Sequence, residues 1–561
     1  MMKKEKFWKI IVVLAMIAYT LKNLFVGADM DEGYGIMAGY RLAMGDRLLL
    51  EMWEPHQTSA IFTAVFIKLF LMITGGINYL NLFLRVVSFL VQGGVAVFLY
   101  KTLRKVWPLM EQKTVVLLSL LYYIITPKCV YVPEYSNLHN WFFTLMILCM
   151  LRYFFTGKKI SYLVWSGICM TCDVLAYPSM VLVFVCCMGY LLLRKSDRKW
   201  KECIAYLLPC VISAAEMFAY LCTYMTPAVM LQMVGEILSE GSHKMTLLQK
   251  IGSWSDGFII VGGLLLLAAV TALGVKLLLM KLLKKKLPES LQVPGLFFLT
   301  AVFLIQVWFW LFGPSSAIYP QIPLVGILVA GLCIFLRKDR SQKAAAYIIG
   351  ITCVSYVAAL LLSNWGPDVL NTYLILGAVV GLLCIGTYWE KIAEKGSQVF
   401  RILCLCLVLG NAFGYCYLMI GASDNHAPVF TNVRGINREG LRAGILTDYM
   451  SAFRYNNNME IWNKAVPSGS TVLYVGASQF YCMLGEHTQA SPDTICSMVY
   501  DERLLDYWKI NPDRYPDVVV FESCYGDISA EGENSFIWNW LQNDFQPVNR
   551  ADYPYITVFT R

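Results

Sequence analysis

The sequence predicts a polytopic α-helical membrane protein that ends in a soluble α/β domain. Of its 561 residues, 58% are hydrophobic and 15% are charged, whereas a soluble domain is about half apolar and about a quarter charged. Many apolar residues form separate runs of about 20, the length that crosses a bilayer. The net charge of +8 is unevenly divided: the chain from Asp424 onward has 10 basic and 17 acidic residues, hence −7, and the preceding part carries +15. This division indicates two regions with different surroundings rather than nucleic-acid binding.

The first apolar run, residues 9–27, follows the basic start MMKKEKFWK and has no small-residue cleavage site after it. We therefore expect a retained first span with the N-terminus in the cytoplasm. The loops between later pairs of apolar runs contain few basic residues and should face outside. The remaining basic clusters should be cytoplasmic, and they occupy residues 101–113, 158–159, 194–201, 276–286, 337–343 and 391–401.

Residues 58–74 interrupt this alternation. If they spanned the membrane together with residues 83–100, the basic KTLRK stretch would face outside. The segment is short and contains Lys68, which favours a helix lying along the membrane surface. About thirteen spans then remain, and an odd number places the chain end opposite the N-terminus. We predict a multi-pass cell-membrane protein with a membrane domain over residues 1–422 and an extracytoplasmic domain over residues 423–561.

The C-terminal domain has the pattern of a mixed α/β fold. Residues 471–476 (TVLYVG) and 517–523 (DVVVFES) are β-branched runs that end in turn residues, which indicates strands. Between them, DERLLDYWKI has helical spacing and an acidic first turn. The domain shows no catalytic constellation, so we expect it to cap the outer cavity and help to select an acceptor; the alternative is a spectator domain.

The first outer loop, residues 28–57, is rich in carboxylates. Because carboxylates repel an anionic membrane surface, their gathering there indicates a function; the alternative is a solvated loop that only keeps the segment outside. The spacing of Tyr34, Met37, Ala38 and Leu42 predicts a helix whose N-terminus carries two of the carboxylates close to the membrane. The acidic residues are Asp29, Asp31, Glu32, Asp46, Glu51 and Glu54.

The stretch DEGYGIMAGYRLAMGD, followed by EPHQTSAIFTAVFIKLF, resembles the first outer loop of the GT-C superfamily of glycosyltransferases, particularly the protein O-mannosyltransferase and aminoarabinose-transferase branch. In that family an Asp-Glu pair opens a juxtamembrane helix, a Gly-Asp follows, and a Pro-containing stretch leads into a second interfacial helix. The resemblance covers the architecture of the first 420 or so residues but the motifs of only the first hundred or so. It implies about thirteen crossings, a variable outer C-terminal domain and inverting transfer of a sugar from polyprenyl phosphate on the outer face.

Such a reaction needs a base for the acceptor hydroxyl and a cation for the departing phosphate. The resemblance makes Asp31 the base, with Glu32 or Asp29 as helper, although in D-M-D-E either aspartate can occupy the position of the base. Arg85, at the outer start of the second span, matches a basic residue of the family and is expected to bind the phosphate. The alternative for Arg85 is an arginine that snorkels from the end of its span.

Further substrate-binding candidates are Glu134, His56, Lys244 and Tyr34. Glu134 lies in the second outer loop, residues 131–143 (YVPEYSNLHNWFF), slightly earlier than the acidic residue of the family. Lys244 lies in a long outer loop that either closes over the donor or forms a solvated amphipathic helix. His56 is a single histidine without a metal-ligand motif, and we predict no metal site and no cofactor. The expected partners are a polyprenyl-phosphate sugar, membrane lipid and a lipid, polysaccharide or protein acceptor.

An envelope lipid or polymer transporter, or flippase, is the alternative function. Transporters usually carry ionisable residues at mid-membrane, whereas the predicted spans contain few, namely Lys22, Asp173 and Glu216. A third alternative is a membrane scaffold without catalytic activity.

Overall fold

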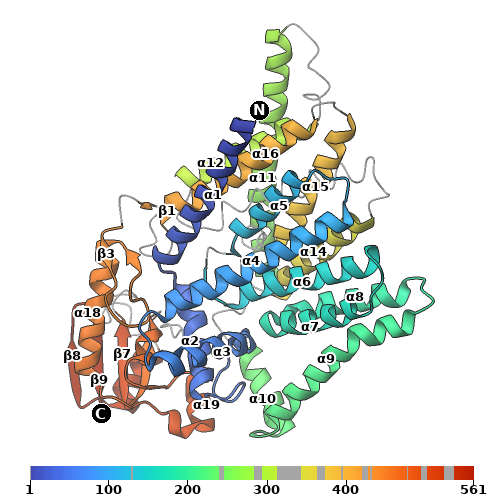
Figure 1. Ribbon diagram of the computed structural model, residues 1–561. Helices are drawn as coiled ribbons and strands as arrows, with labels where there is room; N and C mark the ends of the chain where they lie inside the picture. Colours follow the sequence, from blue (N-terminus) through green and yellow to red (C-terminus); the bar gives the residue numbers. More distant parts are fainter. Residues whose placement is uncertain are drawn as a thin grey trace.

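The computed structural model describes residues 2–127, 130–238, 246–283, 294–312, 343–362, 373–392, 396–419, 427–429, 433–476, 478–494, 502–522 and 536–561. The part before residue 420 is helical (Figure 1). Its helices are α1 (Met2–Phe25), α2 (Met30–Met44), α3 (Ala60–Thr74), α4 (Leu80–Val106), α5 (Gln112–Ile124), α6 (Tyr135–Phe155), α7 (Ser161–Ala176), α8 (Val181–Leu193), α9 (Lys199–Leu221), α10 (Pro227–Leu238), α11 (Leu247–Leu283), α12 (Pro294–Phe312), α14 (Lys343–Leu362), α15 (Ile375–Ile392) and α16 (Gly396–Tyr417).

The prediction of a polytopic helical membrane protein is confirmed. Within the described ranges, eight helices are long and apolar enough to cross a membrane, and six shorter apolar helices accompany them. The eight include residues 57–74, whose helix α3 packs on α2 and exposes Val65, Lys68, Met72 and Ile73 on another face. That an interfacial helix lies here, and that about thirteen helices span, remain predictions.

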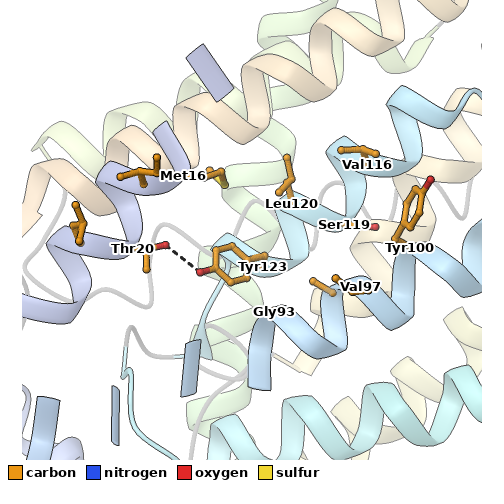
Figure 2. A pocket seen from close by; sticks show the side chains of 12 residues that line it. Met16, Thr20, Gly93, Val97, Tyr100, Val116, Ser119, Leu120 and Tyr123 are labelled. Carbon is orange, nitrogen blue, oxygen red and sulfur yellow. Dashed lines mark hydrogen bonds between the residues drawn. The ribbon is translucent and has the colours of Figure 1, made fainter. Parts of the chain in front are cut away.

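A groove of about 600 Å³ lies between α1, α4 and α5 (Figure 2). Its lining is almost wholly apolar, and the hydroxyl groups of Thr20 and Tyr123 meet across it at 3.0 Å. None of the predicted site residues lines this groove.

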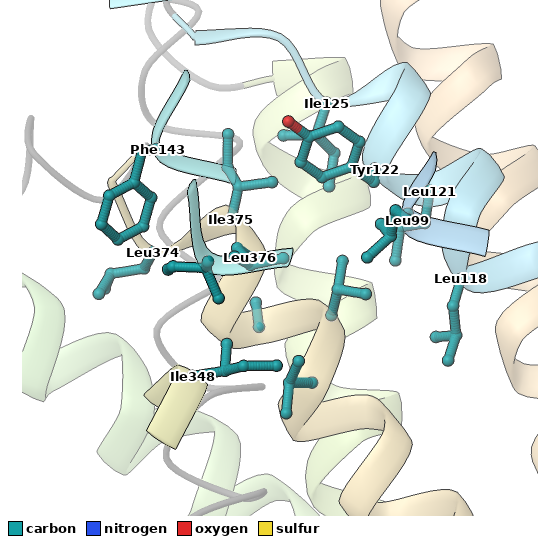
Figure 3. Close-up of a cluster of buried hydrophobic side chains, with 14 of the residues drawn as sticks. Leu99, Leu118, Leu121, Tyr122, Ile125, Phe143, Ile348, Leu374, Ile375 and Leu376 are labelled. Carbon is teal, nitrogen blue, oxygen red and sulfur yellow. The ribbon is translucent and has the colours of Figure 1, made fainter. Parts of the chain in front are cut away.

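Aliphatic and aromatic side chains from α4, α5, α6, α14 and α15 form part of the core of the bundle (Figure 3). Leu99, Tyr122, Phe143, Ile348 and Leu376 are all buried there. By contrast, α9 and α11 expose most of their apolar side chains, as expected of helices that face lipid.

The first outer loop and the C-terminal domain start from the same end of the bundle (Figure 1). Lys22, near the end of α1, donates from Nζ to the carbonyl of Leu418, just after α16, at 2.6 Å. The chain therefore leaves the bundle at one place for both segments. That this end is extracytoplasmic, and that the domain boundary lies at residue 422, remain predictions.

The C-terminal domain contains a mixed five-stranded sheet with the order β6-β5-β7-β9-β8. Strand β5 (Thr471–Val475) is parallel to β6 (Thr488–Gln489) and β7 (Val518–Glu522), whereas β9 (Ile556–Thr560) is antiparallel to β7 and β8 (Asn549–Asp552). Strands β5 and β7 are buried on both faces, which explains their continuous apolar runs. The predicted strands are confirmed, as is the helix between them, α19 (Arg503–Ile510).

The remaining strands are β1 (Leu418–Met419), β2 (Ala427–Pro428), β3 (Gly435–Ile436) and β4 (Leu446–Thr447), and the other helices include α18 (Tyr449–Ala465) and α20 (Phe536–Trp540).

The domain shares one apolar core with the first outer loop. Ile36, Met37 and Tyr40 of α2 and residues of α3 and α4 belong to the same buried cluster as Phe480 and Trp462 of the domain. Backbone bonds reinforce the contact where β4 meets the end of α1, because the N–H of Gly27 donates to the carbonyl of Leu446 at 2.8 Å. Domain and loop therefore form one packed unit.

Candidate active site

The first outer loop forms the helix that its spacing predicts. Asp29 is the N-cap of α2 and accepts a hydrogen bond from the backbone N–H of Asp31 at 2.8 Å. Asp31 and Glu32 occupy the first turn, where the helix dipole favours negative charge. Gly45 ends the helix in the left-handed conformation.

Three glycines allow other segments of the chain to approach α2 closely. A Cβ on Gly35 would lie 2.7 Å from the Cβ of Glu134, and one on Gly39 would lie 2.8 Å from the Cβ of Thr63 on α3. A Cβ on Gly33 would lie 3.2 Å from the ring of Phe480 in the C-terminal domain. At Gly35 and Gly39 a side chain would force a neighbour to shift, and at Gly33 the Phe480 ring would have to move slightly.

Glu32 and Arg85 form a buried ion pair, each 1% exposed. Arg85 donates from Nη2 to Glu32 at 2.5 Å and from Nε at 3.1 Å. Its other donors reach the carbonyl groups of Asn23 and Leu24, both at 3.1 Å, and Gly27 at 2.6 Å.

All five N–H groups of Arg85 are therefore used inside the protein, and binding a phosphate would require breaking at least one of these bonds. Glu32 also accepts from the backbone N–H of Tyr131 at 3.1 Å and from Asn81 at 3.3 Å. The pair thus ties the end of α1, the start of α2, α4 and the second outer loop together.

Asp29 and Asp31 differ from Glu32 in being only half-buried. One carboxylate oxygen of Asp29 is used in capping. Asp31 follows the cap and lies on the same side of the helix as Gly35, which faces the second outer loop.

Three of the predicted substrate-binding residues come together beside Tyr135. The His56 ring stacks on Tyr135 with centroids 4.2 Å apart, and Tyr34 meets the same ring edge-on at 6.3 Å. Glu134 is 1% exposed and caps α6, accepting from the backbone N–H groups of Ser136 and Asn137 at 3.0 and 2.9 Å. Lys244 lies outside the described residues.

The other carboxylates of the loop mainly hold the C-terminal domain. Asp46 pairs with Arg41 at 2.7 Å and with Arg514 at 3.0 Å, and Glu51 also contacts Arg514 at 3.1 Å. Glu54 is 4% exposed and accepts from the backbone N–H of Thr494. Burial raises the pKa of Glu54, and burial together with the Glu54 carboxylate raises the pKa of Tyr34. The large number of acidic residues in the first outer loop is thus partly explained by their contacts with the C-terminal domain.

The structure also shows a pair that the sequence analysis missed. His139 Nδ1 lies 2.7 Å from Asp173 Oδ1, and the two side chains are 3% and 0% exposed. Within the described residues, His139 Nε2 and Asp173 Oδ2 have no hydrogen-bond partner. Tyr177 and Tyr373 surround the imidazole. The positions of the two residues in the sequence could have indicated this pair. His139 lies one turn into α6 and Asp173 lies one turn before the end of α7, so both are at the same end of neighbouring helices.

Fold and site together define a polytopic membrane protein with a polar site at one end of its helix bundle. No family model matches the sequence, and no curated protein matches it. ArnT from Cupriavidus metallidurans, bound to undecaprenyl phosphate, is similar in structure over 98% of this chain and 97% of its own, with 14% identity and a TM-score of 0.45. The Archaeoglobus fulgidus oligosaccharyltransferase, tethered with an acceptor peptide, is similar over 92% of this chain and 69% of its own, with 11% identity and a TM-score of 0.44.

Proposed function

We propose that the protein is a GT-C-type membrane glycosyltransferase that moves a sugar from polyprenyl phosphate to an acceptor hydroxyl on the outer face of the membrane, with inversion. The observation that carries the proposal is the acidic first turn of α2, which the buried Glu32–Arg85 pair fixes at one end of the bundle. A carboxylate held in this way is positioned for proton transfer.

Asp31 is the base in this mechanism. It accepts the proton of the acceptor hydroxyl while the oxygen attacks the anomeric carbon from the side opposite the phosphate. The bond between that carbon and the phosphate oxygen breaks, and polyprenyl phosphate leaves. A positioned base accelerates such a step by about 10²–10⁴-fold.

The neighbouring residues have supporting roles. Glu32 and Arg85 position the helix, and Asp29 caps it and adds negative charge. Tyr34, His56 and Glu134 line the side of α2 that faces the second outer loop and are proposed to contact the sugar, together with Lys244. The C-terminal domain packs on α2, and the basic clusters of the sequence predict that it lies outside the membrane.

The test measures lipid-linked sugars by mass spectrometry in a strain that lacks the protein. The donor should accumulate, and the wild-type gene should remove it. Asp31→Asn should fail to remove it although the protein is inserted normally. Asp29→Asn keeps a good N-cap and should be impaired less. If both variants clear the donor as well as the wild type, neither aspartate is the base, and unchanged donor levels in the deletion strain would contradict glycosyl transfer itself.

A further inference from the structure

The arginines that contact the first outer loop are nearly all neutralised by acidic side chains. Arg85 pairs with Glu32, and Arg41 pairs with Asp46 and also donates to the Glu51 carbonyl at 2.6 Å. The other paired arginines of this region are Arg47, Arg514 and Arg503.

Arg442 of the C-terminal domain is different. Its Nη2 atom lies 4.0 Å from the position that a Cβ on Gly33 of α2 would occupy. Its guanidinium stacks on Phe480 at 4.5 Å and lies 5.7 Å from the centre of the Tyr455 ring. Among the described residues it forms no ion pair, and it is half-buried. Aromatic stacking orients the guanidinium but leaves its charge unneutralised.

The backbone around Arg442 is anchored to the membrane part. The N–H of Tyr79 donates to the Gly440 carbonyl at 3.3 Å, and the N–H of Asn81 donates to the Leu441 carbonyl at 3.1 Å. The N–H of Arg442 itself donates to the Tyr455 hydroxyl at 3.1 Å. These bonds hold the backbone of Arg442 beside the start of α4, and its guanidinium lies next to Gly33, which is on the same side of α2 as Asp29.

We propose that Arg442 binds the phosphate of the polyprenyl-phosphate donor, so that the C-terminal domain supplies part of the active site. This inference rests on the proposed function. As the bond to the sugar breaks, the singly charged phosphodiester becomes a phosphate monoester with a charge of about −1.5 to −2. Arg442 donates N–H groups to that growing charge, while the acceptor proton goes to Asp31. A guanidinium suits this task because its fork matches phosphate geometry.

The experiment compares binding of undecaprenyl phosphate with binding of undecaprenol by the full chain in nanodiscs. The wild type should prefer the phosphate. Arg442→Met keeps the apolar stem on Phe480 but removes the charge, and its affinity for undecaprenyl phosphate should fall at least about tenfold while undecaprenol binding stays unchanged. Arg438→Met is the matched control, because Arg438 lies exposed on the same hairpin.

The outcomes separate the two proposals. A folded Arg442→Met protein that keeps the wild-type ratio of phosphate to alcohol affinity would overturn the role of Arg442 and leave the proposed function standing. A wild-type protein without preference for the phosphate would refute the proposed function as well. If Arg442→Met does not fold, Arg442→Lys replaces it: the ratio should fall several-fold if Arg442 binds phosphate, and an unchanged ratio again overturns the proposal.

Discussion

Replacing Arg85 with Met should destabilise the whole protein rather than affect only its chemistry. The substitution leaves the buried Glu32 carboxylate without its counter-charge and removes the partner of three backbone carbonyl groups. Removing one partner of a buried ion pair costs about 3–5 kcal/mol, against a total stability of about 5–15 kcal/mol for a typical protein.

The unfolding free energy of purified protein in mixed micelles, followed by tryptophan fluorescence, measures this effect. The double variant Glu32→Gln/Arg85→Met should recover much of the loss, because no charge remains buried and the Gln carbonyl still accepts from Tyr131. Arg550→Met, at an exposed ion pair, is the control and should be close to wild type.

Two results would refute the reasoning. One is an Arg85→Met protein within about 1 kcal/mol of wild type, where a buried pair predicts about 3–5. The other is a double variant no more stable than Arg85→Met. A stable Arg85→Met protein that has lost donor binding would instead give Arg85 the phosphate-binding role expected from the sequence.

Three further predictions concern the same region and its neighbour. Gly35→Ala should destabilise the protein by about 1–3 kcal/mol through overlap with Glu134, partly offset by a gain in helix propensity of about 1 kcal/mol. Gly94 has open space around it, so Gly94→Ala should be neutral or stabilising. Thermal unfolding of both variants tests this, and equal shifts in their unfolding temperatures would contradict it. Because the pKa of Glu54 is raised in the folded protein, the folded state binds the proton more tightly, so stability should fall as pH rises through the window above about 4.5. In unfolding curves recorded at a series of pH values, Glu54→Gln should reduce this loss of stability. A loss as large as in the wild type would show that other groups cause it. Asp173→Leu should cost about 1.5–3 kcal/mol by removing the partner of His139, and Asp173→Asn should cost less. An Asp173→Leu protein as stable as the wild type would show that the pair contributes nothing to stability.

Local signals were sufficient for several elements of this fold. The helical spacing after Asp31 predicted α2, and the β-branched run from Thr471 predicted β5, because each pattern reflects the periodicity of one element. The close spacing of Gly33, Gly35 and Gly39 is also in the sequence, but its meaning depends on which segments approach the helix.

Pairings between elements were beyond local signals. Glu32 and Arg85 were each predicted as site residues. Nothing in the sequence around either residue indicates that its partner lies 53 positions away. His139 and Asp173 were likewise considered separately. Arg442 lies in a hairpin without a recognisable motif, and only the packing of the domain on α2 brings it to the loop. Such pairs are properties of tertiary packing rather than of any sequence window.

The bond between Gly27 and Leu446 has a consequence for biosynthesis. The two residues are 419 positions apart, and a ribosome adding about 5–20 residues per second needs roughly 20 to 80 s to travel from one to the other. During that time α2 has already been synthesised, but the segments that later cover it have not. These segments contain strand β4, the Phe480 ring and Arg442. The first loop to emerge is therefore among the last to be completed, so a truncated chain would insert its helices without assembling this region. Truncated chains would lack the contacts that cover α2, and the apolar face of α2 would stay exposed to chaperones and proteases.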